Sequence, residues 1–214
     1  NDGIVAGNTV ISQITIQNSA PTVSGVSINP SNAYVTTTLT CTYSFTDPDG
    51  DADQSIISWY VNSLVAGTGT TISSGYVGGD SVECRVIAND GIVNGNTLTS
   101  SSITIQNSAP TVSGVSISPS TAYATTTLTC PYSFTDPDGD ADQSIISWYV
   151  NSLVAGTGTT ISSGYVGGDS VECRVIANDG IVNGNTLTSS SITIQNSAPT
   201  VSGVSISPST AYAT

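Results

Sequence analysis

Apolar and hydroxyl residues alternate along much of the chain, most regularly between residues 38 and 45. In that segment every second residue is apolar, namely Leu39, Cys41, Tyr43 and Phe45. Successive side chains of a β-strand point to opposite faces, so this pattern predicts a strand with one face in a core. The segment 81–88 alternates in the same way, with inward positions at Val82, Cys84, Val86 and Ala88.

Shorter segments rich in Thr, Ser, Val and Ile fill the rest of residues 22–110, and turn residues separate them. None of these segments shows the periodicity of an amphipathic helix. The expected strands are 22–28, 38–45, 57–61, 64–66, 70–72, 81–88 and 97–106. A polar loop is expected at 46–55 and a turn region at 89–96. Many short strands with frequent turns are typical of an all-β sandwich, here with about seven strands.

The whole pattern is repeated, because each residue from 22 to 110 recurs 89 positions later with four exceptions. The differing pairs are Asn29 and Ser118, Asn32 and Thr121, Val35 and Ala124, and Thr42 and Pro131. Near-identical modules in series are typical of proteins that act through length and repetition. The repeat therefore favours a structural role over catalysis.

The repeat predicts two complete domains, 22–110 and 111–199, between two fragments. Residues 1–21 match the end of a preceding repeat, and residues 200–214 match the start of a following one. Each complete repeat is large enough for one modest core, whereas the fragments are not. The residues 107–110 are expected to form a short joint between the repeats, stiffened by its proline.

Each terminal fragment contains one expected strand. The first lies around Ile14 and Ile16, and the second lies around Val204 and Ile206. Isolated strands are unstable in water, and an unpaired strand edge invites pairing. If these strands form, they must pair with sequence beyond this segment or with another copy of the chain.

The charge of the chain is strongly one-sided. Fifteen acidic residues stand against two basic ones, Arg85 and Arg174, and the formal net charge is −13. Phosphate backbones and anionic membrane surfaces bind clustered cations, so neither nucleic acid nor an anionic membrane surface is expected as a partner. Calcium or a cationic protein is the natural complement. No apolar run is long enough to insert into a membrane as a spanning helix.

Each repeat carries one pair of cysteines, Cys41 with Cys84 and Cys130 with Cys173. An even number at equivalent positions indicates one disulfide per repeat and an oxidising, extracellular compartment. In the loop-entropy account, such a bridge stabilises each repeat by about 4 kcal/mol. The alternative is a pair of buried free thiols. A zinc site is excluded, because it needs four ligands and the chain has no histidine.

The sharpest candidate for chemistry is an acidic loop with a carboxylate at every second position. The loop contains Asp47, Asp49, Asp51 and Asp53, and its copy contains Asp136, Asp138, Asp140 and Asp142. Closely spaced carboxylates repel one another, and a hard cation such as Ca²⁺ takes several oxygen ligands from one flexible loop. The spacing is not that of an EF-hand, since Ala52 stands where that loop needs glycine. The alternative is a solvated acidic turn without a cation.

Three further charged residues have ordinary structural interpretations. Glu83 and Arg85 share one strand face and are expected to form an exposed ion pair of small energy. Asp90 precedes a glycine and is expected to shape a turn. A contribution of Asp90 to a cation site near the joint is the alternative.

The order Cys41, Trp59, Cys84 resembles the Cys–Trp–Cys order of immunoglobulin-like sandwiches. Together with the motifs TDPDGD, NDG and NSAPTV, the repeat is similar to the immunoglobulin-like and cadherin-like repeats of large bacterial and archaeal cell-surface proteins. The resemblance implies a disulfide between the two sheets with Trp59 packed on it. It departs from antibody domains at the tyrosine corner, where Val82 replaces tyrosine. In such proteins the repeats act as spacers and stalks.

Catalysis finds little support in the residue types present. Without His there is no ordinary general base near neutral pH, and without Lys there is no Schiff base. The sequence predicts a non-enzymatic repeat of an extracellular stalk, fibre or giant adhesin. Its partners would be neighbouring repeats, or other copies in a filament. The alternative is an adhesion module that binds carbohydrate or protein through its loops or through an aromatic surface of Tyr34, Tyr60 and Tyr76.

Overall fold

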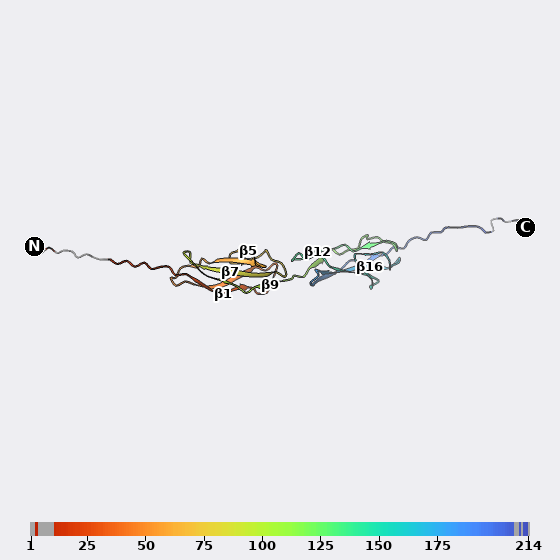
Figure 1. The fold of residues 1–214 in the computed structure, drawn as a ribbon. Coiled ribbons are helices and arrows are strands. Elements are labelled where there is room, and N and C mark those ends of the chain that lie inside the picture. Colours follow the sequence, from red (N-terminus) through yellow and green to blue (C-terminus); the bar gives the residue numbers. More distant parts are fainter. Residues whose placement is uncertain (1–2, 4–10, 208–209, 211, 214) are drawn as a thin grey trace. The chain divides into compact units, whose positions relative to one another are not determined.

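The computed structural model describes residues 3, 11–207, 210, 212 and 213. The chain divides into two compact units, of which the first ends at Gln106 and the second begins at Asn107 (Figure 1). Every regular element of the described residues is a β-strand, which confirms the all-β class predicted from the alternation. No helix in this part of the chain is long and apolar enough to cross a membrane.

The first unit is a sandwich of two sheets. Its strands are β1 (Thr22–Asn29), β2 (Ala33–Tyr34), β3 (Leu39–Thr46), β4 (Ile56–Val61), β5 (Leu64–Thr68), β6 (Thr71–Ile72), β7 (Ser81–Asn89), β8 (Asn94–Thr99) and β9 (Ile103–Gln106). One sheet has the order β1-β3-β6, and the other has the order β2-β9-β7-β4-β5, with β8 also paired to β7. The topology is therefore that of an immunoglobulin-like sandwich.

The chain enters and leaves this unit at opposite ends of β7. Strand β9 pairs antiparallel with the start of β7, where Ser81 lies opposite Thr104. On the entering side, the side chain of Asn18 donates a hydrogen bond to Asp90, which directly follows the last residue of β7. A strand of this length spans about 30 Å, so the two ends are well separated.

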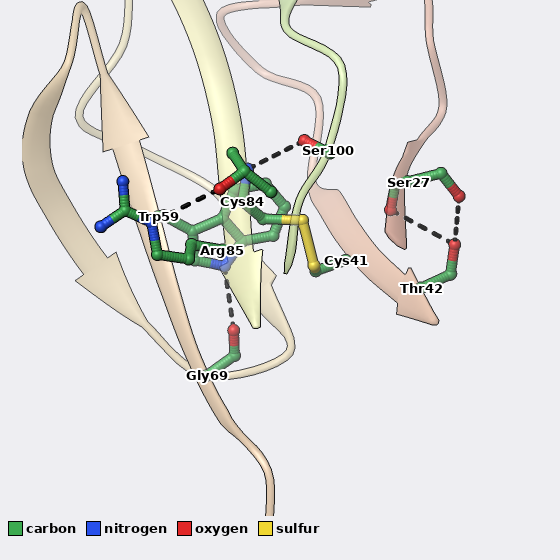
Figure 2. The surroundings of a disulfide bond; sticks show 9 residues. Ser27, Cys41, Thr42, Trp59, Gly69, Cys84, Arg85 and Ser100 are labelled. Carbon is green, nitrogen blue, oxygen red and sulfur yellow. Dashed lines mark hydrogen bonds between the residues drawn. A yellow bond between two sulfur atoms is a disulfide. The ribbon is translucent and has the colours of Figure 1, made fainter. Parts of the chain in front are cut away.

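The core lies between the sheets and is built from the predicted inward positions. Trp59, Val82, Cys84 and Val86 are fully buried. Figure 2 shows Trp59 beside the Cys41–Cys84 disulfide, which joins β3 of one sheet to β7 of the other. The indole Nε1 donates a hydrogen bond to the carbonyl oxygen of Gly69 at 2.9 Å, so the ring is buried without an unsatisfied donor.

The expected departure from antibody domains at Val82 has a structural counterpart nearby. Tyr76 lies in the segment between β6 and β7, is buried, and donates its hydroxyl hydrogen to the carbonyl oxygen of Thr37. This tyrosine thus fixes the segment ahead of β3 from a different position in the sequence. Burial raises the pKa of the Tyr76 hydroxyl, so it stays protonated as a donor.

The second unit repeats the arrangement. Its strands are β10 (Thr111–Ser113), β11 (Leu128–Thr129), β12 (Ser133–Thr135), β13 (Ile145–Val150), β14 (Leu153–Thr157), β15 (Thr160–Ile161), β16 (Ser170–Asn178), β17 (Asn183–Thr188) and β18 (Ile192–Thr193). The disulfide Cys130–Cys173 is the counterpart of the first, so each unit contains one bridge, as expected. The larger sheet has the order β14-β13-β16-β17, and β18 also pairs with β16.

Two features of the strand pattern differ from the sequence prediction. The last strand, expected as 97–106, is divided into β8 and β9, and β8 begins inside the expected turn region. The division falls at buried Ser100, whose Oγ accepts the amide hydrogen of Cys84 in place of a backbone carbonyl. The short strand β2, which pairs parallel with β9, was not expected, because two residues carry no visible alternation.

The terminal fragments do not form the strands expected in them. Ile14 and Ile16 are 87% and 86% exposed, and Val204 and Ile206 are 84% and 86% exposed. The described residues of both fragments lie outside any strand. The remaining parts of the fragments, residues 1–2, 4–10, 208–209, 211 and 214, lie outside the described residues.

Candidate cation site at the acidic end of each repeat

The acidic loop of each unit is organised by its first aspartate. Asp47 Oδ1 accepts hydrogen bonds from the amides of Asp49 at 2.8 Å and Asp51 at 3.1 Å. Gly50 between them has a φ of 84°, which glycine adopts without strain. The loop therefore turns back around the Asp47 side chain and brings the alternate carboxylates together. Asp136 makes the same pair of bonds in the second unit.

Six of the eight predicted ligands form two clusters. Each residue contributes a carboxylate oxygen within 4.8 Å of the others, and the groups are Asp47, Asp49 and Asp51, and Asp136, Asp138 and Asp140. The other two predicted ligands have separate contacts. Asp53 accepts a hydrogen bond from the Tyr43 hydroxyl at 3.0 Å, and Asp142 accepts one from Tyr132 at 2.8 Å.

A second loop carries a further carboxylate at the same end. Asp90 is 4% exposed, and its Oδ1 accepts the amide hydrogens of Ile92 and Val93, both at 2.7 Å. Asp90 therefore shapes the turn, as its place in the sequence suggested. The amide of Val93 and the side chain of Asn18 hold the pKa of this carboxyl below its usual range, and the Ile92 amide adds to this effect.

Asp179 occupies the equivalent place in the second unit and is also 4% exposed. Burial alone would raise the pKa of its carboxyl, but hydrogen bonds from Val182, Asn107 and Ile181 outweigh burial and lower it. Asp179 therefore stays ionised next to the acidic loop, and it adds negative charge to the cluster there.

The carboxylates in the cluster of the second unit repel one another. Burial raises the pKa of Asp140, and repulsion from Asp136, Asp179 and Asp138 raises it further. Moreover, Asp136 Oδ2 and Asn107 Oδ1 are buried and find no hydrogen-bond partner among the described residues. Buried oxygens of this kind are normally paired with a donor or an ion.

The donor set suits a hard divalent cation. The clustered ligand atoms are carboxylate oxygens, and both the Asp47 and Asp136 side chains present a buried oxygen that no described donor satisfies. Oxygen donors in a short flexible loop are what Ca²⁺ binds, whereas softer metals need nitrogen or sulfur ligands. These acidic groups could therefore bind a metal ion.

Two residues at this end were not identified as part of a site from the sequence. Asn107 and Ser108 lie in the expected joint, yet they contact Asp179 and Asp138 of the following repeat. Their hydrogen bonds depend on the folded loops, and a repeat sequence copies every residue, so no sequence pattern distinguishes them.

The other residues considered from the sequence have structural roles. The Arg85 guanidinium lies over the Tyr60 ring at 4.6 Å from its centre and donates a hydrogen bond to the Tyr60 hydroxyl at 3.1 Å, so its contact is cation–π. Tyr76 is buried, whereas Tyr34 is 44% exposed. The three tyrosines therefore do not form one aromatic surface.

Comparison with known proteins identifies resemblances in fold. No protein-family model and no curated protein matches the chain. A segment of two fibronectin type III domains from chicken tenascin shares 14% identity with a TM-score of 0.40, covering 80% of this chain and 98% of its own. The fibronectin(III)-like modules of Clostridium thermocellum CbhA share 15% identity with a TM-score of 0.31, covering 80% of this chain and 95% of their own.

A third similar structure is the Ca²⁺-stabilized adhesin with which an Antarctic bacterium reaches out and binds ice. It shares 18% identity with a TM-score of 0.29, covering 85% of this chain and 49% of its own. These TM-scores are low, and the resemblances carry no argument about function.

Proposed function

We propose that this chain is a structural segment of an extracellular stalk, fibre or giant adhesin, in which each repeat is a spacer or filament-building unit. The observation that carries the proposal is that the chain enters and leaves each unit at opposite ends. In the second unit, Asn107 contacts Asp179 just beyond the end of β16, whereas β18 pairs with the start of β16. A unit of this kind adds its own length to a chain.

Each unit also has its own core and its own covalent crosslink. The buried residues form two separate clusters, one around Trp59 and one around Trp148. The disulfides Cys41–Cys84 and Cys130–Cys173 each close a loop within one unit. Local cores suit a repeated spacer, because each unit is stabilised by its own contacts. The disulfides support an oxidising compartment outside the cytosol. The surface we propose is that of a bacterial or archaeal cell.

The location is tested by immunogold electron microscopy of the source cells with an antibody against residues 22–110. We expect label on projections or fibres outside the cell. Label confined to the cytoplasm would contradict the proposal. Mass spectrometry of the native protein under non-reducing conditions is the matching chemical test, with both disulfides expected inside their own repeats.

We further propose that calcium binds the acidic end of each repeat through Asp47, Asp49 and Asp51, and through their copies in the second unit. The raised pKa of Asp140 and the unpartnered oxygen of Asp136 support this assignment. A cation at this place would relieve repulsion between the carboxylates and stabilise the folded state, because the ligands converge only there.

Calorimetry with calcium or with a chelator tests the calcium proposal. We expect calcium to raise the unfolding temperature of the wild type and to have no effect on a variant carrying Asp51→Asn and Asp140→Asn. The matched control carries Asp53→Asn and Asp142→Asn, which lie outside the clusters, and it should keep the response. Equal transitions of the wild type with and without calcium would leave the solvated acidic turn as the correct interpretation.

A carbohydrate- or protein-binding adhesion module remains a second candidate, because the second unit has an open cavity of about 410 Å³. Its lining includes Leu153 and Val154, which are 75% and 69% exposed, and Asp169. Glycan-array binding by the chain, lost in a Leu153→Asp variant, would favour this function over a spacer.

A further inference from the structure

The four residues before each repeat have the same sequence, Asn-Ser-Ala-Pro, and the same set of contacts. They are residues 18–21 before the first repeat and 107–110 before the second, and each set is called a strap below. The strap of the second unit begins directly after Gln106, the last residue of β9. Both straps contact two loops of the repeat that follows them. One is the acidic loop with Asp49 or Asp138, and the other contains Asp90 or Asp179; these two loops are called the acidic-end loops below.

The polar contacts of the strap go to carboxylates. Asn107 Nδ2 donates a hydrogen bond to Asp179 Oδ2 at 2.8 Å, and the Ser108 amide donates one to Asp138 Oδ2 at 2.5 Å. The first unit has the same bonds, from Asn18 to Asp90 at 2.8 Å and from the Ser19 amide to Asp49 at 2.5 Å. Hydrogen bonds to a charged acceptor are the stronger kind, so each strap is held at two points.

The apolar end of the strap is enclosed as well. Pro110 is fully buried. Its carbonyl oxygen passes so close to Gly184 of β17 that a Cβ on this glycine would lie 1.7 Å from it. Beyond the strap, the side chain of Asn185 binds both the amide and the carbonyl group of Val112, at 2.7 and 2.9 Å. These residues of β17 therefore form a surface against which the end of the strap packs.

A third copy of the same four residues shows that the sequence alone does not produce this structure. Residues 196–199 read Asn-Ser-Ala-Pro, and all four are exposed. Pro199 is exposed, whereas Pro21 and Pro110 are fully buried. The sequence of residues 200–214 does not contain the motifs TDPDGD and NDG, so this copy lacks the loops that bind the other two.

We propose that the strap is a docking device that fixes the connection between repeats to the acidic end of the following repeat. The acidic-end loops provide the binding surface, and the Asn-Ser-Ala-Pro segment that precedes them binds to it. Strand β9 ends at Gln106, and the strap begins with the next residue, Asn107, which is already bound to the second unit. The inference goes beyond the spacer role, since it holds whichever cargo or partner the array carries.

Amide hydrogen exchange of the intact 214-residue chain, followed by NMR in the presence of a chelator, tests the docking. Ser108 and Ser197 have the same neighbouring residues, so their intrinsic exchange rates are equal. We expect the amide of Ser108 to exchange at least about ten-fold more slowly than that of Ser197, because only the former is bonded to a carboxylate. Equal rates would overturn the proposal without affecting the proposed spacer role.

Two variants of the full chain separate docking from the stability of the sandwich. Gly184→Ala places a methyl group against the Pro110 carbonyl and should remove the protection of Ser108. The amide of Cys173, bonded to Ser189 Oγ in the core, should remain protected. The matched control is Thr186→Ala on the same strand, which should leave Ser108 protected.

If Gly184→Ala unfolds the whole repeat, Cys173 also loses its protection. Asn107→Ala then serves as the test of docking. This variant removes one strap contact and changes no residue of the sandwich. We expect Ser108 to exchange at least about ten-fold faster than in the wild type, with the strap at Ser19 as an unaltered reference in the same chain. An unchanged exchange rate of Ser108 in this variant would overturn the proposal.

Discussion

At the scale of single residues, the hairpin between β4 and β5 contains two non-glycine residues with a left-handed backbone. Asn62 and Ser63 have φ values of 48° and 67°, in the left-handed region that glycine prefers. The backbone strain at Asn62 is offset by hydrogen bonds of its side chain. The side chain donates one to Asp80 at 2.7 Å and accepts one from the Ser81 amide at 3.0 Å. No described side-chain hydrogen bond compensates Ser63. The strain at Ser63 is therefore open to improvement by substitution.

Ser63→Gly should stabilise the first unit by about 0.5–1 kcal/mol, because relief of the left-handed strain exceeds the extra chain entropy of glycine. Native-state hydrogen exchange at the Cys84 amide reports the free energy of unfolding of this unit, and Cys173 serves as the unaltered reference. Ser73→Gly, at an exposed position without positive φ, is the control and should destabilise. A destabilised Ser63→Gly variant would show that the turn is not strained.

Asp90 gives the protein an acid-sensitive contact. Its folded-state pKa is lowered, so ionised Asp90 adds stability above the ordinary carboxyl pKa of about 3.9, and this contribution is lost as the pH falls through the lower folded value. Asp90→Asn should therefore be less stable than the wild type at pH 7, and the difference should shrink towards pH 3. Urea unfolding in the presence of a chelator measures this difference in the free energy of unfolding. A difference independent of pH would contradict this role.

Most inward-facing residues could be predicted from alternation alone, because burial of one strand face enforces a period of two. Val82 and Cys84 are fully buried as expected, and Asp53 shows the limit of the same reasoning. Its spacing matches that of the clustered aspartates, but its contact with the Tyr43 hydroxyl depends on where β3 lies. A contact between distant segments cannot be predicted from the spacing of residues within one loop.

At the scale of strands, a single substitution explains the main difference between the two units. Strand β3 is continuous over Leu39–Thr46, whereas its counterpart is divided into β11 and β12. Pro131 replaces Thr42 at the break, and proline has no amide hydrogen to donate to a neighbouring strand. In the first unit, Thr42 also bonds the Ser27 hydroxyl at 2.8 Å across the strands (Figure 2).

Pro131→Thr should restore the strand and stabilise the second unit by about 1 kcal/mol, the typical net value of one hydrogen bond. The reciprocal change, Thr42→Pro, should destabilise the first unit by at least as much. Hydrogen exchange at Cys173 and at Cys84 measures the two effects separately. If Pro131→Thr left the second unit unchanged, the break in the strand would have no energetic cost.

The position of this break was readable from the sequence in principle, since proline inside a central strand is disfavoured. The break at Ser100 was not, because serine is compatible with a strand and its replacement of a backbone acceptor depends on the position of Cys84. The strap contacts could not be predicted either, since the binding surface of the first strap combines a loop after β3 with a loop after β7. The type of each element can be predicted from the local sequence pattern, whereas the break at Ser100 and the strap contacts depend on tertiary structure.

At the scale of the whole molecule, the features of the unit favour addition of length over chemistry. The chain passes from one end of each unit to the other, and each unit has its own disulfide. Such a unit can be repeated without changing its neighbours' cores. We propose that the repeats are additive spacers.

The most direct test of this claim is the contour length of purified chains containing two, four and six repeats, measured by electron microscopy. We predict monomeric chains whose length grows by a constant increment of about 35–45 Å per repeat, as expected for strands of this length and a short connection. Lengths that stop increasing with repeat number, or two-repeat chains that polymerise through their terminal segments, would contradict the account.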